Sequence, residues 1–422
     1  MIFEIQDTAQ FKQQALQWAA TFEVACCLDS NHFKDKYSQF DALIAVGVRD
    51  EVTANAGDAF SLLHKFRQRN PGWITGFLGY DLKNEVEQLW STNADHLHFP
   101  DLYFFAPLHL IVIKGQQVEI ISEQADEVRS YIEQQPPVSS STVQNIRLHS
   151  CFKQTDYIET FEQIKQHILR GDIYVTNFCQ EFFAEDADIN PVQIFSALNQ
   201  VSPNPFSCFF KHYNQYILCA SPERFLAKRG NQLISQPIKG TAKRGHTPEE
   251  DETIKHQLRY NTKEQQENVM IVDLVRNDLT KSAKPGTVQT DELFGIYSFK
   301  QVHQMISTVT CQLDEEIDAV SAIKNTFPMG SMTGAPKLRA MQLMEHYERS
   351  RRGVYSGAIG YFSPTNDFDF NVVIRSIFYN ASDKYLSFQV GSAITHDAVA
   401  EQEYQECLLK AKAILQVLGA TL

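Results

Sequence analysis

Residues 355–390 read YSGAIGYFSPTNDFDFNVVIRSIFYNASDKYLSFQV, and a helical segment follows at residues 400–418. The runs 355–362, 368–379 and 385–390 are rich in β-branched and aromatic residues and predict three successive strands. A doubly wound α/β fold alternates strands with helices, and this stretch does not. It therefore favours an α+β fold.

The segment before this stretch adds elements of both kinds. We expect a helix that begins at Thr155 or Asp156, either of which can act as its N-cap, and that ends at Gly171. Strand-like runs follow at residues 173–183 and 216–220. Strands and helices thus mix without strict alternation here as well.

One break in composition divides the chain. Residues 134–144 read QQPPVSSSTVQ, in which paired Pro and successive Ser are typical of a linker. We expect an N-terminal region over residues 1–135, a linker over 136–147 and a catalytic region over 148–420. The N-terminal region mixes strand-like runs with helical pieces and shows no catalytic constellation.

The bulk composition restricts the function. The 422 residues carry a net charge of −13 and a pI of about 5.5, which argues against broad nucleic-acid binding. The N-terminus lacks the apolar segment of a signal peptide, and no run of 18 apolar residues predicts a membrane span. The eight Cys do not have zinc spacing, so we expect a cytoplasmic protein with free thiols.

Two pairs of acidic residues lie in helical stretches. Glu264 and Glu267 are in KEQQENVMIVDLV, and Glu403 and Glu406 are in EQEYQECLLKAK. The spacing of three residues places both members of a pair on one helix face. If the two helices converge, their carboxylates surround one point and suit a hard ion, Mg²⁺ above all. The alternative is that each pair is a solvated acidic face. A di-iron site is disfavoured because no His follows at the required spacing.

A segment of small residues, GSMTGAPK at 330–337, precedes the helical sequence LRAMQLMEHY. Exposed backbone N–H groups and the helix dipole would bind an anion there. The segment lacks the Gly-Lys-Ser/Thr of a Walker A loop, so a carboxylate is as plausible as a phosphate. An ordinary capped turn is the alternative.

Two further residues are candidates for nucleophilic and proton-transfer chemistry. Lys239 lies between Ile238 and Gly240, and a lysine that is desolvated in such a place can become a neutral nucleophile. Glu223, in SPERF, is a candidate general acid or base. The simpler alternatives are a surface lysine and an ion pair between Glu223 and Arg224.

An arginine and a histidine occur in apolar surroundings. Arg375 lies in NVVIRSIFY, where an arginine needs an anionic partner, either structural or substrate. His303, in QVHQMISTV, is as well explained by a hydrogen-bonded core position as by catalysis.

Taken in order, these segments resemble one family. The order is SPERF, PIKGT, ENVMIVDLVRNDL, VHQMISTV, GSMTGAPK, YSGAIGYF, VVIRS and EYQEC. It resembles the chorismate-utilising enzymes, which include anthranilate, aminodeoxychorismate, isochorismate and salicylate synthases. The resemblance is strong over about residues 150–418 and weak in the N-terminal region. It implies a family-specific α/β sandwich of paired antiparallel sheets with outer helices, in which the N- and C-terminal halves interlace.

The PIxGT motif distinguishes members of this family. Anthranilate, isochorismate and salicylate synthases resemble one another in having Ala where this chain has Lys239. Lys at this position resembles aminodeoxychorismate synthase component I, which makes 4-amino-4-deoxychorismate from chorismate and ammonia in para-aminobenzoate and folate biosynthesis. The alternatives are anthranilate synthase component I and a catalytically silent subunit that positions a glutaminase.

The resemblance also implies roles for individual residues. Lys239 would attack C2 of chorismate, and Glu223 would protonate the departing C4 hydroxyl. Glu267 and Glu406 would bind Mg²⁺ directly, and the other member of each acidic pair would help. Residues implied to line the chorismate site are Gly240, Thr241, His303, Thr333, Tyr355, Arg375, Gly391, Ser392, Ala393 and Lys410.

One departure from the family concerns water and ammonia. Val175 falls where isochorismate and salicylate synthases have a Lys that activates water, and where relatives that use ammonia usually show Gln. Valine cannot act as a base, so addition of water is disfavoured. No glutaminase segment with a nucleophilic Cys is recognisable. A glutamine amidotransferase subunit is therefore implied as the source of ammonia, in a heterodimer.

Overall fold

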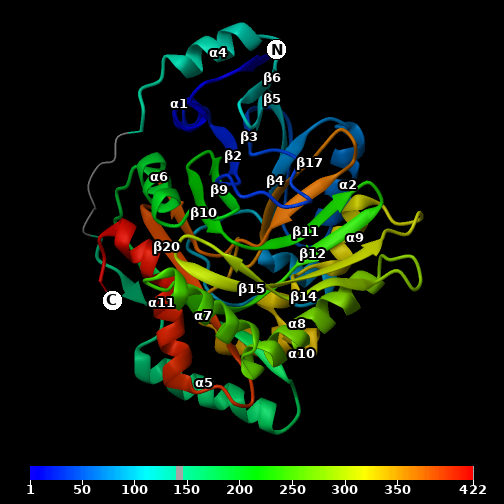
Figure 1. Cartoon of the computed structure of the whole chain (residues 1–422), viewed down its shortest axis with the longest axis vertical. Coiled ribbons are helices and arrows are strands. Elements are labelled where there is room, and N and C mark those ends of the chain that lie inside the picture. Colours follow the sequence, from blue (N-terminus) through cyan, green and yellow to red (C-terminus); the bar gives the residue numbers. More distant parts are fainter. Residues whose placement is uncertain (139–145, 422) are drawn as a thin grey trace.

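Antiparallel strands form the frame of the molecule (Figure 1). The computed structural model describes residues 1–138 and 146–421. The predicted linker over 136–147 therefore falls largely outside the described residues. In the described part, every pairing between named strands is antiparallel, which confirms the predicted α+β class with paired antiparallel sheets.

The strands form two ladders that share β5. The first ladder runs in the order β1 (Ile2–Glu4), β6 (Gln117–Ile121), β5 (Leu102–Lys114), β3 (Ala42–Ala54), β2 (Val24–Asp29), β9 (Phe206–His212), β10 (Gln215–Ser221), β19 (Ser376–Asn380), β20 (Tyr385–Ile394) and β8 (Val175–Ala184), with β7 (His149–Ser150) and β16 (Gly334–Ala335) on β8. The second ladder leaves β5 in the order β4 (Ile74–Leu78), β17 (Ala358–Phe362), β18 (Phe368–Asn371), β11 (Arg224–Arg229), β12 (Gln232–Gln236) and β15 (Val302–Gln312), with β13 (Ile238–Lys243) and β14 (Gln289–Ser298) on β15.

The helices cover this frame from outside, with α4 at one end and α5 at the other (Figure 1). They are α1 (Thr8–Ala20), α2 (Ala59–Arg69), α3 (Lys83–Val86), α4 (Ala125–Glu133), α5 (Gln154–Leu169), α6 (Pro191–Val201), α7 (Pro248–Arg259), α8 (Thr262–Thr280), α9 (Ala319–Thr326), α10 (Lys337–Tyr347) and α11 (Ala400–Leu418), with short 3₁₀ turns at Tyr80–Leu82 and Gly330–Met332. Within the described residues, we find no helix with the length and apolarity needed to cross a membrane.

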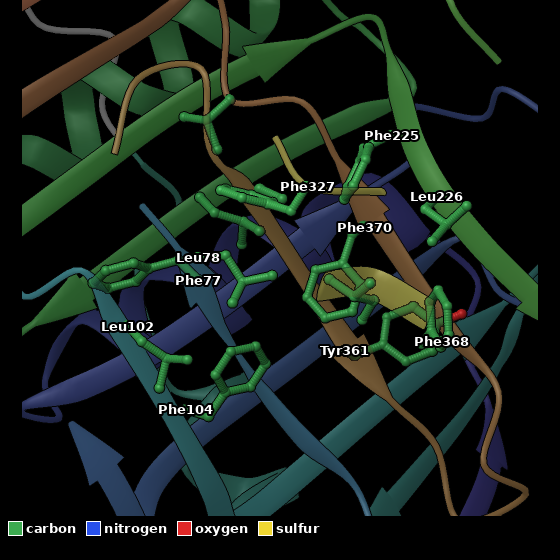
Figure 2. Close-up of a cluster of buried hydrophobic side chains, with 14 of the residues drawn as sticks. Phe77, Leu78, Leu102, Phe104, Phe225, Leu226, Phe327, Tyr361, Phe368 and Phe370 are labelled. Carbon is green, nitrogen blue, oxygen red and sulfur yellow. The ribbon is translucent and has the colours of Figure 1, made fainter. Parts of the chain in front are cut away.

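Alternating side chains of the central strands pack into two separate hydrophobic cores. On β9, Phe210 enters the first core and Phe209 the second, as the period of two along a strand requires. The first core lies between the ladders, because Phe77 of β4 packs edge-on against Phe210 at 5.4 Å. Figure 2 shows Phe77, Phe104 and Phe370 among its members. The second core lies between the first ladder and helices that include α5, α6 and α11.

The two halves of the chain interlace, as the family resemblance implies. Strand β2 pairs with β9 through Cys26 and Phe210, and β4 pairs with β17 through Phe77 and Ile359. Strands from before and after the predicted linker therefore share one hydrogen-bonded frame. The proposed domain boundaries stay a prediction.

The predicted N-cap of the helix near residue 155 is wrong. Helix α5 begins at Gln154, and its N-cap is Lys153, without a side-chain capping bond. The Asp156 carboxylate instead pairs with Arg349 at 3.1 Å. The side chain of Asp156, which the local sequence suggested as a cap, thus pairs with a residue far along the chain instead. The end of the helix is as predicted, with Gly171 at φ +82° directly after it.

The predicted strand over 368–379 is two strands. β18 belongs to the second ladder and β19 to the first, so the chain crosses between the ladders after Asn371. Arg375 lies in this crossing with φ +55°. The apolar run gave no sign of the break, because both strands and the crossing lie inside the protein. The predicted strand over 355–362 likewise shortens to β17.

Replacing Phe104 by Ala is expected to destabilise the fold by about 3–5 kcal/mol, because the ring is fully buried in the first core and leaves a cavity. Urea denaturation followed by circular dichroism measures this change. Leu108 lies on the same strand but is 49% exposed, so Leu108→Ala should change stability by about 0.5 kcal/mol or less. Equal effects of the two substitutions would contradict the assigned core.

Candidate active site

A bulge in β13 presents Lys239. The register of β13 against β15 shifts between Ile238 and Thr241, so Lys239 and Gly240 stand outside the regular ladder. Bulges bend a strand and re-aim its side chains. Gly240 has φ +104°, and a Cβ atom there would lie 3.1 Å from Oε2 of Glu264. Glycine thus permits both this backbone conformation and the close approach to α8.

Helix α8 contacts both the main chain and the side chain of Lys239. The Asn268 amide donates to the Lys239 carbonyl at 3.3 Å, and the Ser307 hydroxyl donates to Asn268 at 2.6 Å. Nζ of Lys239 lies 3.5 Å from Oε2 of Glu267, and 18% of the lysine side chain is exposed. Lys239 is therefore not an ordinary surface lysine. Its amine lies beside the carboxylate of Glu267.

The two acidic pairs, on α8 and α11, lie close enough to repel each other. Burial raises the pKa of Glu264, and the charges of Glu267 and Glu406 raise it further. Burial also raises the pKa of Glu403, with Glu406 again adding to the effect. The pairs therefore share one region of the protein instead of forming two separate solvated faces.

Lysines neutralise part of this negative charge. Nζ of Lys410 lies 2.7 Å from Oε1 of Glu406 and lowers the pKa of that carboxyl to about 2. Nζ of Lys263 lies between Glu267 and Glu403. Among the described residues, no three or more His, Cys, Asp or Glu side chains are arranged to hold a metal ion. The four glutamates offer only oxygen donors, the ligand type that Mg²⁺ prefers, so the residue types suit the ion although they are not arranged around one point here.

Glu223 lies beside β13 and is 4% exposed. Burial raises the pKa of its carboxyl to about 7. The Ser331 hydroxyl and the Ile238 amide oppose this shift, as do the charges of Lys239 and Arg375. A carboxyl with this pKa can give up and take back a proton near neutral pH, as a general acid must.

The neighbouring Arg224 does not pair with Glu223. Its guanidinium contacts Asp35 at 2.6 Å and Asp369 at 3.0 Å. Successive residues of an extended strand point to opposite faces, so the two side chains diverge. The alternative of an ion pair between Glu223 and Arg224 is therefore wrong.

Arg375 lies at the crossing between the ladders, where its left-handed backbone conformation is uncommon for a residue with a side chain. Burial lowers the pKa of Arg375, and the nearby Tyr355, Glu406 and Glu223 oppose this shift. No ion pair joins Arg375 to a carboxylate in the part of the chain that the structure describes. A structural carboxylate partner is thus absent among these residues, and the role of Arg375 towards an anionic ligand stays a prediction.

The end of β20 contributes mainly backbone groups. Nζ of Lys410 donates to the carbonyl oxygen of Gly391 at 2.8 Å. The Ser392 hydroxyl lies 3.1 Å from the Tyr157 hydroxyl, on the face of β20 that borders the second core. Gly391 and Ala393 face the opposite side. The hydroxyl of Ser392 is therefore hydrogen-bonded on the face of β20 opposite to Gly391 and Ala393.

His303 and Thr333 are engaged within the chain. The fully buried ring of His303 has Nε2 2.8 Å from Asp251 and Nδ1 2.9 Å from Ser298. The Thr333 hydroxyl donates to the Gly330 carbonyl at 3.2 Å. Both ring nitrogens of His303 are engaged, so its direct contact with a ligand would require one of these bonds to break, whereas the Thr333 hydroxyl can still accept a hydrogen bond. For His303, the contacts favour the core alternative.

The GSMTGAPK segment is built into the sheet. Its Ala335 pairs with Val175 of β8, and Lys337 pairs with Asp278 of α8 at 2.5 Å. Lys337 is therefore bound to α8 and not offered to an anion. The predicted anion site stays a prediction for the start of α10.

A sequence model of the family described as chorismate binding enzyme matches residues 24–416. The chain belongs to this family.

A protein from Bacillus subtilis (strain 168) named aminodeoxychorismate synthase component 1 is 34% identical over 406 residues, which are 90% of this chain and 86% of that protein. Anthranilate synthase component 1 from Cereibacter sphaeroides is 32% identical over 81% of this chain and 72% of its own length. The crystal structure of anthranilate synthase component I from Streptococcus pneumoniae TIGR4 has a TM-score of 0.77 and 24% identity, covers 90% of this chain and 95% of that one, and shows the same fold.

Sequence reasoning missed three residues in this chorismate-binding enzyme. Asn268 fixes the Lys239 backbone, Ser331 contacts Glu223, and Lys263 contacts two acidic residues. Ser331 lies within GSMTGAPK, so attention to the polar members of that motif could have found it. Asn268 likewise lies within ENVMIVDLVRNDL and could have been found in the same way, whereas Lys263 carries no comparable signal in the sequence.

Proposed function

We propose that this chain catalyses the amination of chorismate at C4, the reaction of aminodeoxychorismate synthase component I. The observation that carries the proposal is the amine of Lys239, presented by a bulge between buried Glu223 and the acidic residues of α8. The relative from Bacillus subtilis bears the name of this activity. Membership of the family supports chorismate as the substrate.

The first half of the reaction makes a covalent intermediate. Nζ of Lys239 attacks C2 of chorismate, the ring double bonds shift, and the C4 hydroxyl leaves. Glu223 gives a proton to that hydroxyl, which departs as water, and the attacking amine loses a proton to solvent water. Covalent catalysis of this kind divides one difficult displacement into two easier steps.

The second half reverses the shift of bonds. Ammonia adds at C4, the ring double bonds return, and the C2–Nζ bond breaks. The proton lost by the incoming ammonia returns to Glu223, and the amine of Lys239 takes back a proton from solvent water as it leaves. Chorismate and ammonia thus give 4-amino-4-deoxychorismate and water, and the enolpyruvyl group is retained.

The proposed cofactor is Mg²⁺, held by Glu267 and Glu406 with help from Glu264 and Glu403. When bound, it would neutralise the ring carboxylate of chorismate. The proposed source of ammonia is a glutamine amidotransferase subunit in a heterodimer, and the proposed location is the cytoplasm.

The second candidate is anthranilate synthase component I, which is supported by the similar identity of the Cereibacter sphaeroides relative. Lys239 opposes it, because amination with loss of pyruvate needs no nucleophilic lysine at this position. Chorismate, Mg²⁺ and ammonium supplied to the purified chain should yield 4-amino-4-deoxychorismate by chromatography and mass spectrometry. Formation of anthranilate and pyruvate alone would overturn the proposal.

Arg375→Gln is expected to lower kcat/KM for chorismate by about 10–100-fold, mainly through a higher KM, since a charged hydrogen bond to a carboxylate is worth about 1.5–3 kcal/mol. The reason is the guanidinium at the ladder crossing, which has no carboxylate partner among the described residues. Steady-state kinetics over a range of chorismate concentrations measures the change.

The matched control is Arg276→Gln on the outer side of α8, where the arginine is 49% exposed. It should leave KM within about twofold of the original, because exposed charges contribute little. An unchanged KM in Arg375→Gln would remove Arg375 from the substrate site.

A further inference from the structure

Lys263, in the first turn of α8, connects the two acidic pairs. Its Nζ lies 3.8 Å from Oε1 of Glu267 and 3.5 Å from Oε1 of Glu403, on α11. The two carboxylates are 10% and 5% exposed, whereas the lysine side chain is 45% exposed. The amine of a half-exposed lysine thus contacts two buried carboxylates that belong to different helices.

The amine of Lys263 lies where a metal ion shared by the two helices would lie. Glu267 uses its other oxygen, Oε2, for Lys239, and Glu406 is paired with Lys410. Only Lys263 spans α8 and α11 by touching a carboxylate on each, among the ion pairs of the described residues. An ion coordinated by Glu267 and Glu403 would need the oxygens that face Lys263.

The contacts of Lys263 are weak enough to be exchanged. A charged hydrogen bond from nitrogen to oxygen is about 2.7–2.9 Å long, and both contacts of this amine are longer. Mg²⁺ binds oxygen at about 2.0–2.1 Å and carries twice the charge, so it competes well with an ammonium group. The half-exposed lysine stem can turn its amine out into solvent.

We propose that Lys263 is an internal counter-ion of the metal site. In the metal-free chain it holds Glu267 and Glu403 together across two helices, and it must swing away before a divalent ion binds. This inference rests on the proposed function, which places Mg²⁺ at these carboxylates. In this role Lys263 has two effects. It stabilises the site when no metal is bound, and it lowers the affinity for the metal by competing for the same carboxylate oxygens.

The test is titration of the purified full chain with MgCl₂, without chorismate, by isothermal calorimetry. Lys263→Met removes the charge and keeps the length of the side chain. We expect its Kd for Mg²⁺ to fall by about tenfold, because a competing charge near two partly buried carboxylates is lost. We also expect its metal-free Tm to fall and its Tm in saturating Mg²⁺ to match that of the original chain.

Two variants control for charge and for folding. Lys284 is 40% exposed and pairs with Glu315 at 2.7 Å, so Lys284→Met removes a similar charge outside the acidic cluster and should leave Kd unchanged. Lys263→Arg keeps the positive charge and should retain most of the competition, which tests the idea even if Lys263→Met does not fold.

The outcomes separate this inference from the proposed function. An equal or weaker affinity in Lys263→Met, with normal affinity in the original chain, overturns the role of Lys263 alone. Binding by the variant but not by the original chain supports it in its strongest form. Absence of Mg²⁺ binding in both chains overturns the inference together with the proposed metal ligands.

Discussion

Lys239→Ala is expected to lower kcat by about 10³-fold or more, because removal of a nucleophile closes the covalent route altogether. The bulge in β13 and the amide of Asn268 hold the Lys239 main chain and do not depend on its side chain. The variant should therefore fold and bind chorismate. Product formation from chorismate, Mg²⁺ and ammonium, followed by chromatography, measures the loss.

The control for this variant lies on the same strand. Lys243 is exposed at the far end of β13 and makes no ion pair among the described residues, so Lys243→Ala should keep kcat within about twofold. Mass spectrometry of the original chain with chorismate and without ammonium should show an adduct on Lys239. Turnover by Lys239→Ala within tenfold of the original would rule out a lysine nucleophile.

Much of the fold could be predicted because the deciding signals are local. The helix over 400–418 has the expected bounds, and Gly419, which follows it in the sequence, takes the left-handed conformation that ends a helix. The break between β18 and β19 could not be predicted in this way. It depends on the strands with which each half pairs, and two of these, β11 for β18 and β10 for β19, lie more than 100 residues earlier in the chain.

The site was predictable in its parts but not in its assembly. The spacing of Glu264 and Glu267 gives one helix face, yet their approach to α11 follows from packing between distant segments. Lys263 makes this limit plain. A lysine in the first turn of a helix normally extends into solvent, and its partner Glu403 is 140 positions away.

The burial that suits Glu223 to its proposed role as an acid also destabilises the folded state when the carboxyl is ionised. Glu267 and Glu406 have lysines beside them, but no ion pair neutralises Glu223 among the described residues. Burial without such a partner disfavours the ionised carboxylate and extends the protonated form, which an acid needs, up to about neutral pH. Activity and stability should therefore respond in opposite directions when Glu223 is replaced.

Glu223→Gln is expected to lower kcat by about 10²–10⁴-fold, the usual contribution of a positioned general acid. Its effect on stability depends on pH. The folded-state pKa of about 7 lies above that of an unfolded glutamic acid, so stability is lost as pH rises from about 4.5 through 7. At pH 8 the ionised carboxylate costs the folded chain about 3 kcal/mol, and glutamine avoids this cost.

Urea denaturation at pH 5 and pH 8 tests this second effect. The free energy of unfolding of Glu223→Gln should exceed that of the original chain at pH 8, and the difference should shrink at pH 5, where the carboxyl is protonated in the folded state. Glu316 is exposed, so Glu316→Gln should show neither this gain nor the loss of turnover. A Glu223→Gln variant that keeps its activity would exclude the acid role. A stability difference that does not change with pH would show that Glu223 is not the buried acid inferred from its surroundings.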